Sequence, residues 1–111
     1  MTALEKLDRI KALTDKSKTV FGMTWQEAEE VVALRADIKV SDWFIWTGEN
    51  EGSLESFYKI MGCETNHIGR WNQKLQDAIN AGYVTTYDFK QHGRYHWMVK
   101  LTRAGKKLLN M

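Results

Sequence analysis

Cysteine and long apolar runs are scarce in this sequence. The 111 residues contain a single cysteine, Cys63, so no internal disulfide can form, and we expect a buried thiol at this position. No run of about 18 apolar residues occurs, and the charged start MTALEKLDRI lacks the apolar core of a secretory signal. The sequence therefore predicts neither a membrane span nor an export signal, and by default a cytoplasmic location.

Signatures of catalysis and of metal binding are also missing. The chain has no glycine-rich phosphate loop, no nucleophile elbow and no zinc signature. Cys63 and His67 are four residues apart, as are His92 and His96, but the first pair spans an expected helix cap and the second an expected hairpin tip. We therefore expect no enzyme, no cofactor and no metal site, which leaves a binding surface.

The charge is unevenly distributed along the chain. The first 52 residues contain seven Lys or Arg against ten Asp or Glu, whereas the remaining 59 contain nine against four. All three histidines lie in the basic second half. This asymmetry indicates a polyanionic partner, although an ordinary solvated surface would also explain a modest imbalance.

The stretch from Ser53 to Val84 has the pattern of two helices joined by a tight turn. Apolar residues at three- and four-residue steps predict a first helix that starts at Ser53 and ends at Gly62. Thr65 is a suitable N-cap for a second helix that continues to about Ala81. The apolar stripe of this second helix consists of Ile68, Trp71, Leu75 and Ile79.

Two more helices are expected near the N-terminus, opened by the capping boxes Thr2 with Glu5 and Thr24 with Glu27. The first runs to about Lys16 and has apolar residues three apart, so its apolar surface winds around the helix. Such a helix could pack on its own domain with one side and on a second subunit with the other. The alternative is a loosely packed terminal helix. The second helix has an apolar side formed by Trp25, Ala28, Val31 and Val32.

The segment between these helices and Ser53 has an ambiguous apolar run. We expect Ser41 to cap a helix that carries the run from Trp43 to Trp46, with a short strand as the alternative. A polar loop is expected from Gly48 to Gly52.

A β-hairpin is predicted after the helical pair. Two segments rich in β-forming residues, 83–89 and 95–102, flank Lys-Gln-His-Gly-Arg, in which Gly93 supplies the positive φ of a tight turn. Alternation predicts one buried face formed by Tyr95, Trp97, Val99 and Leu101. Thr102 is then expected to cap a last helix whose Leu108 and Leu109 pack inward.

The order of these elements resembles a winged helix-turn-helix. The segment LTRAGKKLL, residues 101–109, is similar to the segment that follows the wing in MarR- and PadR-type regulators. The resemblance covers Val40 to Met111. It implies a mainly α fold with a small β-hairpin (α+β), in which residues 1–39 form an N-terminal helical extension packed on a core of residues 40–111 as one compact domain.

The resemblance also implies how the chain would contact duplex DNA. The helix from Thr65 to Ala81 would enter the major groove, and the wing from Lys90 to Arg94 would contact the backbone. Sequence preference would come from Asn66, His67, Arg70 and Gln73. Phosphate contacts would come from Thr65, Lys74, Lys90, His92 and Arg94.

Two functions remain open. The first is a DNA-binding transcriptional regulator that forms a homodimer through its N-terminal helices, because one such module makes too few contacts for selective binding. The second is a winged-helix module for protein–protein interaction, an inhibitor or adaptor, whose acidic N-terminal half and exposed tryptophans meet a protein partner with little or no DNA binding.

Overall fold

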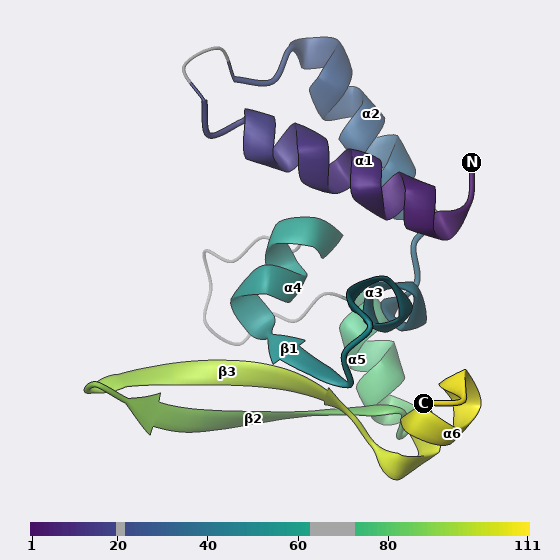
Figure 1. The fold of residues 1–111 in the computed structure, drawn as a ribbon, viewed down its shortest axis with the longest axis vertical. Helices are drawn as coiled ribbons and strands as arrows, with labels where there is room; N and C mark the ends of the chain where they lie inside the picture. Colours follow the sequence, from purple (N-terminus) through teal and green to yellow (C-terminus); the bar gives the residue numbers. More distant parts are fainter. Residues whose placement is uncertain (20–21, 63–72) are drawn as a thin grey trace.

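The fold combines helices with a small antiparallel sheet (Figure 1). A computed structural model describes residues 1–19, 22–62 and 73–111. Within these ranges the elements are α1 Ala3–Lys16, α2 Trp25–Ala36, α3 Val40–Thr47, β1 Glu51–Ser53, α4 Leu54–Met61, α5 Gln73–Asn80, β2 Val84–Gln91, β3 Arg94–Leu101 and α6 Arg103–Leu109. The expected α+β class is confirmed. None of the helices so described is long and apolar enough to cross a membrane.

Both predicted capping boxes are present. The Thr2 side chain accepts from Glu5 N–H, and the Thr24 side chain accepts from Glu27 N–H. In return, each glutamate carboxylate accepts a bond from the backbone N–H of its cap residue. The two helices are joined by ion pairs between Arg9 and Glu30 at 2.9 Å and between Lys16 and Glu27 at 2.8 Å. The bond from Lys16 is the main reason why the pKa of Glu27 falls to about 2.

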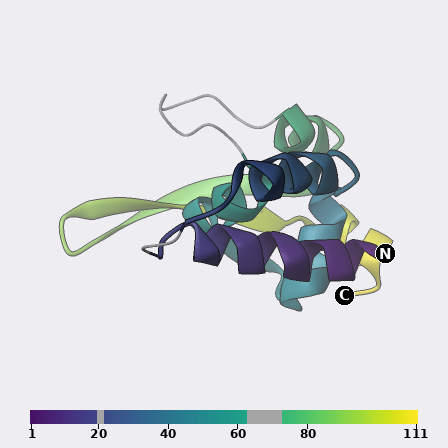
Figure 2. The same cartoon turned by 90° about the horizontal axis from the view of Figure 1, so that it is seen from above.

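Helix α1 lies between α2 on one side and α3 and α4 on the other (Figures 1 and 2). Of its apolar residues three apart, Leu7, Ile10 and Leu13 are buried, whereas Leu4 is 42% exposed. The α3 contact includes a 2.8 Å bond from Trp46 Nε1 to Asp8 Oδ1, and the α4 contact a 2.7 Å ion pair from Lys59 to Asp15. The winding apolar surface therefore has two neighbours within the same chain.

The region between α2 and α4 differs from the sequence prediction. Helix α3 begins at Val40 rather than after Ser41, because the Asp42 carboxylate accepts a 2.9 Å bond from the backbone N–H of Lys39 and caps the helix earlier. The expected loop of residues 48–52 contains the start of strand β1. Gly52 on this strand is required, since a Cβ there would lie 2.5 Å from Trp43 Cη2.

The core surrounds three aromatic rings. Trp43 contacts Phe44 and Phe57 edge to face, with ring centroids 4.9 and 5.1 Å apart. Helix α4 supplies Phe57 and has the predicted bounds: Ser53 is its N-cap, and Gly62 ends it with a φ of +75°. The turn glycine and the apolar spacing therefore predicted this helix correctly.

The sheet has the strand order β1-β3-β2, with both pairs antiparallel. Gln91 pairs with Arg94, so His92 and Gly93 form a two-residue turn, and both have positive φ, +53° and +79°. The predicted hairpin is confirmed, including the role of Gly93.

The predicted buried face of the hairpin is only half correct. Val99 and Leu101 are buried, but Tyr95 is 67% exposed and Trp97 43% exposed. The reason is length: the hairpin extends beyond the helices in both views, so its outer half is not covered by the core (Figures 1 and 2).

The last helix is capped as predicted but packs differently. The Thr102 hydroxyl accepts from Gly105 N–H at 3.1 Å and donates to the Gly82 carbonyl at 2.6 Å. Leu109 is partly buried against the core, whereas Leu108, which the sequence predicts to pack inward, is 58% exposed. Adjacent helix positions point about 100° apart, and of the two leucines only Leu109 faces the core here.

Candidate nucleic-acid interface

The predicted recognition helix is only partly within the described residues. Thr65, Asn66, His67 and Arg70, together with Cys63, lie in the range 63–72, outside the described residues, so their roles stay predictions. The described helix α5 begins at Gln73. Its Leu75 is fully buried and its Ile79 is partly buried, so the apolar stripe predicted for this part of the helix does face the core.

The two predicted contact residues on α5 have different surroundings. Gln73 is exposed, and its Nε2 donates a 2.7 Å bond to Asp77 Oδ1 one turn later. Lys74 is half-buried, and its ammonium donates to the carbonyls of Arg35, Ala36 and Ile38. Lys74 therefore satisfies carbonyl groups at the end of α2. Its predicted phosphate contact remains a prediction, and that contact would have to coexist with these bonds.

The three predicted wing residues come together at the hairpin tip. Lys90, His92 and Arg94 are all exposed, and they lie within or beside the turn that joins β2 to β3. Asp88 is the single carboxylate among residues 84–101 of the sequence. The tip therefore has a net positive charge and, being the outermost part of the hairpin, is open to a large anionic surface (Figure 1).

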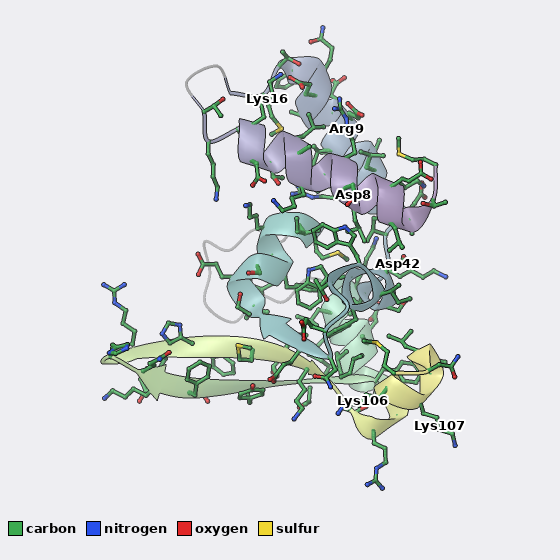
Figure 3. All side chains as sticks on the ribbon, in the orientation of Figure 1. Asp8, Arg9, Lys16, Asp42, Lys106 and Lys107 are labelled. Atoms are coloured by element: carbon green, nitrogen blue, oxygen red, sulfur yellow. The ribbon has the colours of Figure 1, made fainter. Side chains whose placement is uncertain are left out.

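The lysines of the last helix do not join this charged tip. Figure 3 shows Lys106 and Lys107 on α6, at the end of the molecule opposite the hairpin tip. The basic second half of the sequence is therefore divided in space, and the tip is a separate cationic site.

The exposed aromatic rings on the hairpin were not predicted from the sequence. On one face, Tyr95 and Trp97 lie opposite Lys90 and Asp88, respectively. On the other face are Tyr87, Phe89 and His96; Phe89 stacks on His96 with centroids 5.3 Å apart, and the Tyr87 hydroxyl donates a 2.6 Å bond to Glu51. The strand length was the signal that could have indicated these exposed rings. Each strand has eight residues, and the core covers only the inner part of the hairpin (Figure 1).

A second exposed apolar surface lies on α2. Trp25 is 77% exposed and Val32 is 69% exposed, whereas Val31 is buried against α1 and the core. Together with Ala28, Glu29 and Ala33, Trp25 and Val32 border a shallow hollow of about 360 Å³. We call this surface the α2 stripe. Most of the apolar side predicted for this helix is therefore at the surface.

Metal binding and family relationships give no further guidance. Among the described residues, no three or more His, Cys, Asp or Glu side chains are grouped so as to hold a metal ion. Comparisons with protein-family models, with curated proteins and with solved structures find no match to this chain.

Proposed function

We propose that residues 40–111 are a winged helix-turn-helix that binds duplex DNA, with the hairpin as its wing. The order helix, short strand, helix, helix and hairpin agrees with this proposal, as does the pairing of β1 with the inner hairpin strand β3. The single observation that carries it is the cationic two-residue turn at the end of a hairpin that extends beyond the helices. Such a tip suits the phosphate backbone beside a groove.

The proposed roles follow from the chemistry of the side chains. Lys90 and Arg94 would neutralise phosphates and release counterions, which supplies affinity without sequence preference. Gln73, at the described start of α5, has an amide that can pair with adenine. Asn66, His67 and Arg70 retain the base-reading roles that the resemblance implies, and Thr65 a phosphate contact.

The proposal predicts that a double replacement, Lys90→Ala with Arg94→Ala, weakens binding to all duplex sequences alike. We expect affinity to fall about tenfold near physiological salt, because two cations that neutralise phosphates are removed. The slope of log affinity against log salt should also become shallower by about 1 for each of them. Fluorescence anisotropy with labelled duplexes of two unrelated sequences measures both quantities.

The matched control removes the same charge from the opposite end of the molecule. Lys106→Ala with Lys107→Ala leaves the wing intact and should change affinity much less. Equal losses in the two double variants would mean that net charge alone drives binding, which contradicts a role for the wing. A change of sequence preference in the wing variant would contradict its assignment to phosphates.

A homodimer through the N-terminal helices belongs to the same proposal, and the α2 stripe is the surface that favours it. In an antiparallel pair of α2 helices centred near Ala28, Trp25 of one protomer would face Val32 of its partner. The small side chains of Ala28 and Ala33 would leave room for the indole. One two-fold axis would thus cover both exposed residues at once.

The α2 stripe also supports a second candidate function, a protein-interaction module that docks a different protein there. Sedimentation of the wild type and of Trp25→Ser separates the two. We expect a wild-type dimer that the replacement converts to monomer, with folding unchanged because the side chain is exposed. A wild type that stays monomeric and binds no duplex DNA would favour the second function.

A further inference from the structure

The outer half of the hairpin presents two aromatic rings on one face. Tyr95 and Trp97 are two residues apart on β3, so their side chains emerge on the same side of the sheet. Tyr95 is 67% exposed and Trp97 is 43% exposed. The same face of β3 is buried nearer the core, where it carries Val99 and Leu101. Aromatic rings kept at the surface in this way favour a contact with a flat partner.

The spacing of the two rings suits one particular partner. Residues two apart on a strand are separated by about 7 Å, and strand side chains stand roughly perpendicular to the sheet. Stacked nucleic-acid bases are about 3.4 Å apart. About twice that distance is what one base needs to stack with a ring on each side, and the strand spacing matches it.

Charged groups surround the rings. Lys90 lies opposite Tyr95 in the hairpin register, and its ammonium is 5.9 Å from the centre of the tyrosine ring. Asp88 lies opposite Trp97, whereas Arg94, next to Tyr95 in the chain, emerges on the other face of the hairpin. Charged residues are depleted in the buried centres of protein–protein interfaces, so these rings are poorly suited to burial against an apolar protein surface. Cations beside stacking rings are typical of surfaces that bind single-stranded nucleic acid.

We propose that Tyr95 and Trp97 bind one unpaired base of a polynucleotide between their rings, while Lys90, on the same face, contacts an adjacent phosphate. This inference rests on the proposed function in one respect, that the wing meets nucleic acid. It goes beyond that function because a base within an intact duplex cannot enter the slot. The ligand is an unpaired segment of DNA or RNA, such as a single strand or a frayed duplex end.

The test compares oligonucleotides that differ only in their bases. Fluorescence anisotropy measures the affinity of the full chain for single strands of about 12 nucleotides, in deoxyribose and ribose forms, and for an abasic strand of the same length. We expect the base-bearing strand of at least one sugar type to bind about tenfold more tightly than the abasic strand, because the latter keeps the phosphates but has no base to stack.

Variants assign this difference to the two rings. Tyr95→Ala and Trp97→Ala should each lower affinity for the base-bearing strand about tenfold and leave abasic binding unchanged. Tyr95→Phe and Trp97→Phe keep an aromatic ring and should retain most of the affinity, which guards against misfolding as the explanation. Leu108→Ala, which shortens an exposed side chain on α6, is the control and should have no effect.

The outcomes separate this inference from duplex binding. Equal affinity for base-bearing and abasic strands, or alanine variants that bind like the wild type, would overturn the slot even if the duplex is bound through the wing cations. If the alanine variants also lose binding to the abasic strand and to the duplex, the slot is likewise overturned. The rings would then be needed for folding rather than for binding a base. A ring-dependent preference for base-bearing strands without any duplex binding would support the slot and sink the proposed duplex function.

Discussion

Replacing Gly105 by alanine is expected to lower the free energy of unfolding by about 3 kcal/mol, because the added methyl group overpacks a tight contact. A Cβ at this position would lie 2.1 Å from the carbonyl oxygen of Tyr83 and 3.0 Å from the Leu101 side chain. The backbone of Tyr83 cannot move freely, since the same carbonyl accepts a 3.0 Å bond from Thr102 N–H. Helix α6 would have to leave its position.

Whether the replacement stabilises or destabilises the protein shows whether α6 packs closely at this position. Glycine to alanine inside a helix ordinarily stabilises by about 1 kcal/mol, so a helix that did not pack closely here would gain stability. Gly82→Ala is the matched control: it adds the same methyl group into open space at a φ of +81°, where only the left-handed strain of about 1 kcal/mol applies. Urea unfolding of both variants measures the difference, and a stabilised Gly105→Ala protein would contradict the close approach.

Replacing Lys74 by methionine is expected to cost about 2 kcal/mol, although lysine is usually a surface residue whose replacement is tolerated. The ammonium donates to three carbonyls, those of Arg35, Ala36 and Ile38, at the junction between α2 and α3. Methionine has a similar length but no donor, so these carbonyls would be without their charged partner. Thermal unfolding followed by circular dichroism measures the destabilisation.

The control for this experiment is Lys107→Met, an exposed lysine on α6. It should leave the unfolding temperature almost unchanged. Equal stability of the two variants would mean that the ammonium of Lys74 does not hold the junction. The stability of this variant also bears on tests of DNA binding. If removal of Lys74 destabilises the fold, weaker binding by the same variant does not report a phosphate contact. Lys90 and Arg94 are exposed at the hairpin tip, so their replacement reports on binding itself.

Much of the fold could be predicted because its signals are local. The capping boxes of α1 and α2 need only residues three apart, and Ser53 with Gly62 fixes α4 in the same way. The hairpin turn follows from Gly93 between two segments of β-forming residues. Each of these signals lies within the element that it predicts or directly beside it.

Other features could not be predicted because they depend on tertiary contacts. Strand β1 is only three residues long and exists because it pairs with β3, which follows it in the chain only after α4, α5 and β2. Lys74 looks like an exposed cation by helical position, yet the end of α2 lies within its reach. The exposure of Tyr95 and Trp97 depends on how far the helices extend over the hairpin, and the length of the strands is the one signal of it in the sequence.

The candidate site was predicted in part. Lys90, His92 and Arg94 do meet at the hairpin tip, as the turn chemistry indicated. The charge count of the second half includes the lysines of the last helix, and the structure separates them from the tip because α6 lies at the other end of the sheet. The hairpin tip and its exposed rings therefore carry the binding hypothesis more directly than the total charge of the second half does.

The salt dependence of wild-type binding to a random-sequence duplex tests the central claim most directly. If the wing and α5 contact the phosphate backbone, log affinity should fall linearly with log salt concentration, with a slope steeper than about −2, because at least Lys90 and Arg94 would release counterions. A flat salt dependence, or no binding at low salt, would contradict the proposal that this chain binds duplex DNA.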